Sequence, residues 1–88
     1  MSRKTSKQTK LPSKEARDAI TEYLVALEET YPVAKGKARV VKRQDNRIIV
    51  SVPLPSTVPE RMLLFDRMAE VGTRLLLETD EYIILSSL

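Results

Sequence analysis

The chain has 88 residues, a net charge of +3 at neutral pH, and neither cysteine nor histidine. These absences exclude disulfides, thiolate zinc sites, cysteine nucleophiles and catalytic pairs of the Ser-His or Cys-His type. No apolar run approaches the roughly 18 residues of a membrane-spanning helix, and no signal peptide is visible. We therefore expect a cytoplasmic protein with no membrane association.

The first segment of the chain is basic and polar. Residues 1–12 carry four basic and no acidic side chains, and Leu11 is their one large apolar side chain after the initial methionine. Such a segment buries too little surface to offset the entropy cost of ordering it. We predict a disordered basic tail over residues 1–12 and a single small domain over residues 13–88.

A helical pattern begins at Ser13, a residue type that often caps helix N-termini. Apolar residues then recur on one arc at helical spacing, with Val25 as an outlier on the polar side, until Pro32 stops the pattern. The pattern predicts a helix over residues 13–30. The apolar arc consists of Ala16, Ala19, Ile20, Tyr23, Leu24, Ala26, Leu27 and Tyr31.

The next segment reads as a β-hairpin. Residues 37–43 and 47–53 are rich in strand formers and are separated by three turn-forming residues. A three-residue loop would set the cross-strand partners, and a four-residue loop would shift them without changing the alternation within each strand. The predicted core face carries Ala38, Val40, Ile48, Val50 and Val52. The opposite face carries Lys37, Arg39, Val41, Arg43, Arg47, Ile49 and Ser51.

A second helix follows two prolines that end the strand. Thr57 and Glu60 have the spacing of a capping box, and apolar residues again recur at helical spacing. We predict a helix over residues 57–77, in which Gly72 allows a close approach of another backbone. An alternative interpretation makes residues 74–77 a strand of a second hairpin.

Residues 82–85 form the last strand in this prediction, after a turn at Thr79 and Asp80. The element order is α-β-β-α-β. It predicts an α+β fold in which two helices pack on one face of a three-stranded, mainly antiparallel sheet.

The acidic residues offer little for catalysis. The pairs Glu28–Glu29 and Asp80–Glu81 could in principle bind Mg²⁺. Adjacent residues on a helix point about 100° apart, so Glu28 and Glu29 do not converge. We predict a non-enzymatic protein with no catalytic residues, no cofactor and no metal.

The outer face of the hairpin is the first candidate binding surface. Val41 and Ile49 would be cross-strand neighbours among basic residues, and apolar residues framed by arginine are typical of protein interfaces. Either Ile83 or Ile84 extends this apolar spot if the last strand lies beside the hairpin. We predict a small, self-associating interaction module of unknown partner. Its binding residues are Lys37, Arg39, Val41, Arg43, Arg47 and Ile49.

Two further hypotheses stay open. The helix outliers Val25, Leu63 and Leu77 offer a second surface for a homodimer. The Lys-rich tail and the basic hairpin, where residues 35–53 carry six basic and one acidic side chain, favour accessory nucleic-acid binding as the alternative function. Against nucleic acid, we expect no aromatic residue on the outer face for base stacking.

Overall fold

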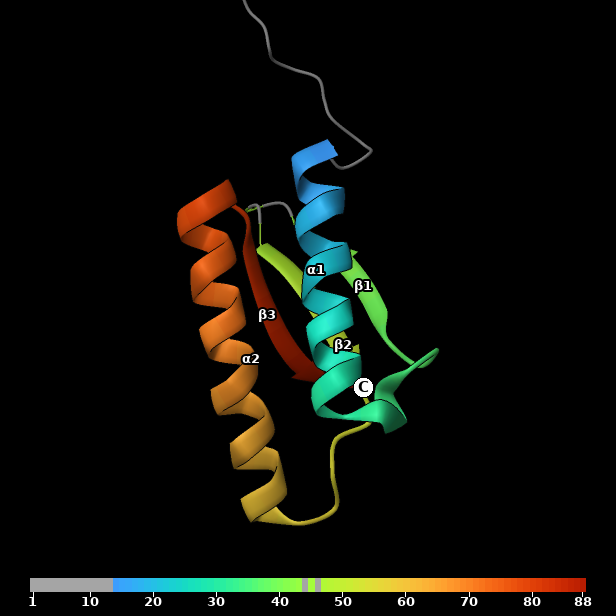
Figure 1. Ribbon diagram of the computed structural model, residues 1–88. Coiled ribbons are helices and arrows are strands. Elements are labelled where there is room, and N and C mark those ends of the chain that lie inside the picture. The colour runs from blue at the N-terminus through green and yellow to red at the C-terminus, as the bar shows by residue number, and fades with distance from the viewer. Residues whose placement is uncertain (1–13, 44, 46) are drawn as a thin grey trace, which may run out of the picture.

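The computed structural model describes residues 14–43, 45 and 47–88, so the predicted tail lies outside the described residues. The predicted order α-β-β-α-β is confirmed. A short 3-10 helix separates the first helix from the hairpin. The elements are α1 (Lys14–Thr30), η2 (Pro32–Ala34), β1 (Arg39–Lys42), β2 (Arg47–Val52), α2 (Val58–Thr79) and β3 (Tyr82–Ser87) (Figure 1).

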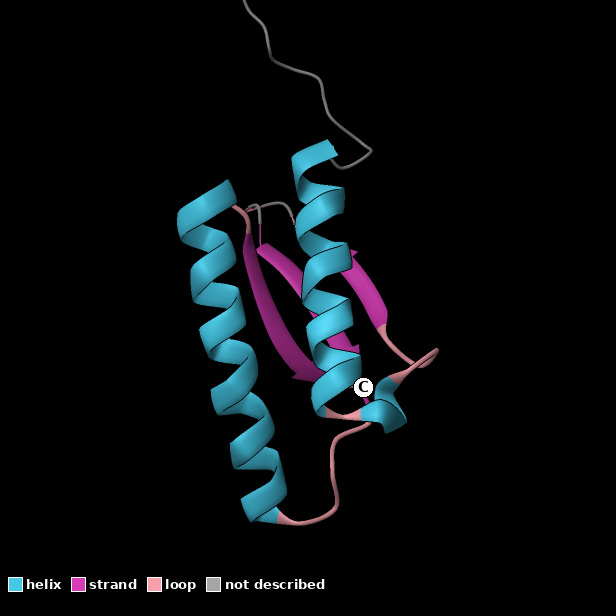
Figure 2. Ribbon diagram, viewed as in Figure 1, coloured by secondary structure: helices cyan, strands magenta, loops and turns pink. Residues whose placement is uncertain are grey.

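Two layers make up the fold, and they confirm the predicted fold class. The strands form one sheet in the order β1-β2-β3. Both helices lie on the same face of this sheet, and no described helix or strand covers the other face (Figure 2).

The sheet is mixed, whereas the sequence predicted a mainly antiparallel one. β1 pairs with β2 in antiparallel fashion, but β3 runs parallel to β2. The reason is the length of α2, whose 22 residues span about 33 Å. This helix returns the chain along the sheet, so β3 begins at the same end as β2 (Figure 1).

Of the two hairpin loops that the sequence left open, the structure has the three-residue loop. The amide of Arg43 donates to the carbonyl of Arg47 at 2.7 Å, and Val41 pairs with Ile49. The strands are shorter than the predicted ranges of 37–43 and 47–53 because pairing stops at Arg39 and at Val52.

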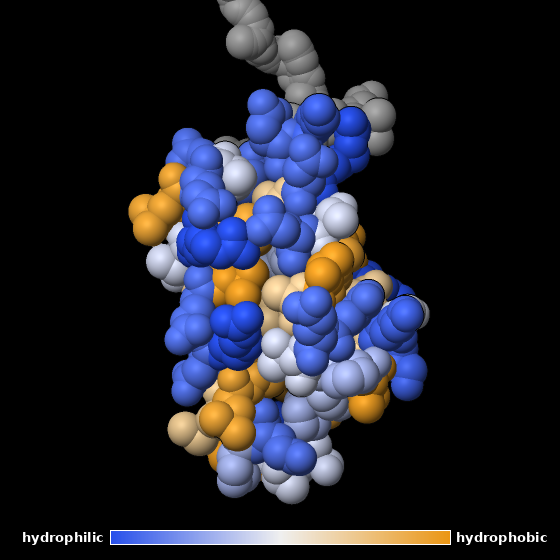
Figure 3. All heavy atoms as spheres, in the orientation of Figure 1, coloured by the Kyte–Doolittle hydropathy of each residue, from blue (hydrophilic) through white to orange (hydrophobic). Residues whose placement is uncertain are grey.

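The core lies between the inner face of β2 and the two helices. The inner residues of β2 are fully buried, as their alternation predicted. On the helical face, polar side chains dominate, and apolar side chains gather in the seam between the helices (Figure 3). The largest fully buried side chains are Tyr23, Leu27, Ile48, Val50, Val52, Met68 and Leu75.

The prediction that Val40 belongs to the core is wrong. Val40 is 38% exposed, and all four residues of β1 are exposed. β1 is an edge strand of the sheet, and the helices cover mainly β2 and β3 (Figure 1). Alternation decides which face a side chain points to, but burial also requires a layer above that face.

Hydrogen bonds between residues close in sequence cap both ends of α2. The hydroxyl of Thr57 accepts a hydrogen bond from the amide of Glu60 at 3.3 Å and donates to its carboxylate at 2.8 Å. At the other end, Asp80 adopts a left-handed conformation (φ 66°), and its amide donates to the carbonyl of Leu76. The helix therefore continues to Thr79, and the alternative strand over residues 74–77 is wrong.

Gly72 allows the predicted close approach. A β-carbon at this position would lie 3.1 Å from the backbone carbonyl oxygen of Ile83 and 3.7 Å from the ring of Tyr23. The helix backbone thus packs directly against the edge of β3. This contact compensates for the low helix propensity of glycine.

Candidate interaction surface on the outer sheet face

The face of the sheet opposite the helices, here called the outer face, is a small grid of side chains. Val41 pairs with Ile49, and Ile49 pairs with Ile84, so three branched apolar side chains form a row across all three strands. Two rows flank this apolar row. They consist of Arg43, Arg47 and Tyr82 on one side, and of Arg39, Ser51 and Ser86 on the other.

The outer face is exposed all along the edge strand β1 and only in part on β2 and β3. Val41 is 46% exposed and Tyr82 is 50% exposed, while Ile49 and Ile84 are half-buried by their neighbours. An apolar row framed by arginines has the composition of an interface centre and its rim.

Arg47 is partly neutralised by the hairpin loop. Its guanidinium forms an ion pair with the carboxylate of Asp45 at 2.7 Å and donates a second hydrogen bond to it from Nε at 2.8 Å. The hydrogen bond from Arg47 lowers the pKa of Asp45, and the same interaction raises the pKa of Arg47. The register of the parallel pair places Tyr82 on β3 opposite Arg47.

The other two arginines of the outer face keep their charge available. Arg39 and Arg43 are exposed, and neither takes part in an ion pair within the described residues. A partner with carboxylates or phosphates would therefore find two uncompensated guanidinium groups along β1, one on each side of Val41.

The register brings five of the six predicted binding residues onto one surface. The sixth, Lys37, lies before β1, where its amide donates to the carbonyl of Ala34 at 2.9 Å as part of a turn. Lys37 is exposed but does not belong to the sheet. The five residues on the outer face are Arg39, Val41, Arg43, Arg47 and Ile49.

Two further residues of this surface were not assigned from the sequence. Ile84 takes one of the two positions left open, and Tyr82 overturns the expectation that the outer face lacks an aromatic side chain. The sequence does show that Tyr82 and Ile84 share a face, because residues two apart on a strand point to the same side. Which face of the sheet they occupy depends on the neighbour and the direction of β3, which the sequence does not show.

The helix outliers form no single patch. Val25, Leu63 and Leu77 are exposed by 50%, 70% and 82%. However, Leu63 and Leu77 lie 14 residues apart on α2, a distance of about 21 Å along the helix axis, and Val25 belongs to α1. Scattered exposed apolar residues of this kind are ordinary on protein surfaces.

The candidate carboxylate pairs stay apart from any larger cluster. Asp80 ends α2, and the amide of Glu81 donates to the hydroxyl of Thr79 at 3.3 Å. Within residues 14–43, 45 and 47–88, no three acidic side chains come close enough to hold a metal ion. In the same part of the chain, no helix has the length and apolar content needed to cross a membrane.

Comparison of the chain with protein-family models, with curated proteins and with solved structures gives no match.

Proposed function

We propose that this protein is a non-catalytic interaction module that binds a protein partner on its outer face. The observation that carries the proposal is the partly exposed apolar row of Val41, Ile49 and Ile84 on a sheet face that no described element covers. Removing the remaining exposed apolar surface of this row from water would favour binding of a partner, and contiguous apolar patches on a protein surface mark binding sites.

The charges of the outer face define the chemistry of the partner. Arg39 and Arg43 border the apolar row without a carboxylate of their own, so the matching surface has apolar side chains bordered by Asp or Glu. A second copy of this chain is the less favoured occupant, because pairing two outer faces brings the same arginines together. Like charges at an interface oppose association.

The test compares outer-face variants with a matched variant elsewhere. The double variant Val41→Ser, Ile49→Ser removes most of the apolar row, and Leu63→Ser removes a more exposed apolar side chain from α2. Affinity capture from cell extract, read out by mass spectrometry, is expected to retain the same proteins with wild type and Leu63→Ser. We expect the double variant to lose them.

The two other results have different meanings. Retention of every captured protein by the double variant would overturn the proposal. If wild type is a dimer in light scattering after size exclusion and the double variant is a monomer, the occupant of the outer face is a second copy and not an acidic partner.

One observation favours a second candidate, a single-stranded nucleic acid. Tyr82 is half exposed in the same row as Arg43, whose guanidinium has no ion-pair partner within the described residues, so a stacking surface and a phosphate-binding group lie in one row. Stacking of one base on an aromatic side chain contributes about 1–3 kcal/mol, and each phosphate contact steepens the salt dependence by about 0.7 units for a single strand.

Fluorescence anisotropy with labelled oligouridine tests this candidate. Tyr82→Ala is expected to weaken binding by about 5- to 100-fold, while Tyr82→Phe keeps the aromatic ring and retains most of the affinity. Equal affinity in Tyr82→Ala, or binding that does not change with salt concentration, would rule out this mode of binding.

A further inference from the structure

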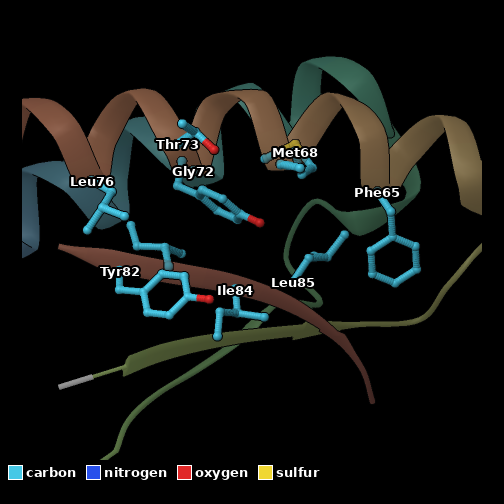
Figure 4. A pocket seen from close by; sticks show the side chains of 11 residues that line it. Phe65, Met68, Gly72, Thr73, Leu76, Tyr82, Ile84 and Leu85 are labelled. Carbon is cyan, nitrogen blue, oxygen red and sulfur yellow. The ribbon is translucent and has the colours of Figure 1, made fainter. Parts of the chain in front are cut away.

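A groove separates α2 from β3 on the side of the sheet away from β1. Its volume is about 280 Å³. Met68, Gly72 and Leu76 of α2 line one wall, and residues 82–85 of β3 line the other, with Phe65 at one end (Figure 4).

The hollow exists because α2 presents small residues to the edge of β3. Ala69, Gly72 and Thr73 lie between the larger side chains of Met68 and Leu76 along the groove. Ala69 and Thr73 are exposed at the rim, whereas Met68 is only 1% exposed. The groove therefore has a buried apolar floor and an open rim.

Tyr23 brings a polar group to this floor from α1. Its side chain lines the groove, is 1% exposed, and packs its ring against Gly72. Burial raises the pKa of its phenol, and no hydrogen bond to its hydroxyl is made within the described residues. A buried hydroxyl without a partner is unfavourable, and a ligand that supplies one recovers this free energy.

The edge of β3 adds backbone groups to the same wall. The amide of Leu88 donates to the carbonyl of Val52, and in a parallel pair the backbone groups of alternate residues face alternate sides. Ile83 and Leu85 therefore direct their amide and carbonyl groups away from β2. The carbonyl oxygen of Ile83 indeed lies against Gly72.

We propose that this groove binds a neutral, mainly apolar small molecule whose hydrogen-bonding group meets the hydroxyl of Tyr23. No charged side chain lines the groove, which favours a neutral ligand. A cavity of about 150 Å³ holds benzene, so a volume of 280 Å³ accommodates roughly ten non-hydrogen atoms. An apolar pocket with a few converging polar groups is the usual form of a small-molecule site. This inference goes beyond the proposed function, because it concerns a different class of ligand in a groove that shares only Tyr82 and Ile84 with the outer face.

Indole and 4-methylphenol are the probes, titrated into the full chain and followed by the amide resonances of Gly72, Ile83 and Leu85. We expect saturable shifts at these amides with a Kd of about 1 mM or lower. Shifts that do not saturate, or that occur mainly elsewhere, would overturn the proposal.

Three variants assign the binding to the groove. Tyr23→Phe keeps the ring and removes the hydroxyl, so binding of both probes should weaken by about 2- to 10-fold. Ala69→Leu fills the groove from its exposed rim and should weaken binding at least about 10-fold. Leu63→Ala, on α2 but outside the groove, should bind like wild type.

The melting temperature of the free protein shows whether the hydroxyl of Tyr23 stabilises the fold or is available to a ligand. Tyr23→Phe removes a hydroxyl that has no internal partner, so its Tm should equal or exceed that of wild type. A clear fall in Tm, or an unchanged affinity for both probes in a folded Tyr23→Phe protein, would contradict the role given to this hydroxyl.

Discussion

Alternate residues of one strand, β2, meet two different environments. Ile48 and its inner-face neighbours are fully buried beneath the helices, whereas Ile49 lies in the exposed apolar row of the outer face. Both residues lie opposite partners on β1 and on β3, so the difference in burial arises from the helical layer on the inner face. Stability therefore depends mainly on the inner face, and substitutions on the outer face should cost less.

The largest expected effect on stability distinguishes Ile48 from Ile49. Ile48→Ala should lower the free energy of unfolding by about 2–5 kcal/mol, because it leaves a cavity in a fully buried site. Ile49→Ala should lower it by less than about 1 kcal/mol. Urea denaturation of both variants measures the difference, and Ile48→Val provides a milder variant with a cost of about 0.5–1.5 kcal/mol. Equal losses in the two alanine variants would mean that the outer face is covered in the native protein.

Gly72 tests how tightly the helical layer is seated on the sheet. Gly72→Ala adds a β-carbon 3.1 Å from the carbonyl oxygen of Ile83, so we expect a net loss of about 1–2 kcal/mol despite the better helix propensity of alanine. Thr73→Ala, the adjacent exposed position, should leave stability unchanged or raise it slightly. Thermal denaturation measures the stability of both variants. A Gly72→Ala protein that is more stable than wild type would show that β3 can move away from the added β-carbon at little cost.

The buried phenol of Tyr23 makes the inner side sensitive to alkaline pH. Burial raises its pKa, so the folded state keeps the phenol protonated where the unfolded phenol, with a pKa of about 10, ionises. Stability from this group is complete below pH 10 and falls by about 1.4 kcal/mol per unit above it. Urea denaturation between pH 9 and pH 11 measures the slope, which Tyr23→Phe should lack. A wild-type slope identical to that of Tyr23→Phe would contradict the burial.

The smallest expected effect on stability concerns the ion pair of Arg47 and Asp45 at the outer face. Arg47 lowers the pKa of Asp45 mainly through a hydrogen bond, so Arg47→Gln should raise that pKa while stability stays within measurement error. Titration of the carboxyl carbon of Asp45 by NMR follows the change, and Arg39→Gln is the control that should leave it unaltered. An unchanged pKa in Arg47→Gln would show that the pair is absent in solution.

Much of the fold was predictable because the relevant signals are local. The alternation in residues 47–53 identified the buried side of β2, and the spacing of Thr57 and Glu60 located the start of α2. Caps and alternation act within a few residues, so they can be recognised without knowledge of distant neighbours.

The candidate site was predictable only in part, for a physical reason that Tyr82 illustrates. Its alternation with Ile84 was visible, but which face of the sheet the pair occupies depends on how β3 lies beside β2. The exposure of Val40 has the same kind of cause, since β1 presents an inward side that the helices do not cover. Both outcomes depend on packing between segments that are distant in the chain.

The order of the elements and the mixture of apolar and basic side chains on one face of the hairpin followed from local sequence patterns. The length of the hairpin loop, the parallel direction of β3, the completion of the apolar row by Ile84 and the position of Tyr82 beside Arg47 became clear only from the folded chain. The tertiary structure also placed Tyr23 at the floor of the groove between α2 and β3. The division follows from the range of the forces involved: hydrogen bonding and periodicity select local structure, whereas burial depends on which layers meet.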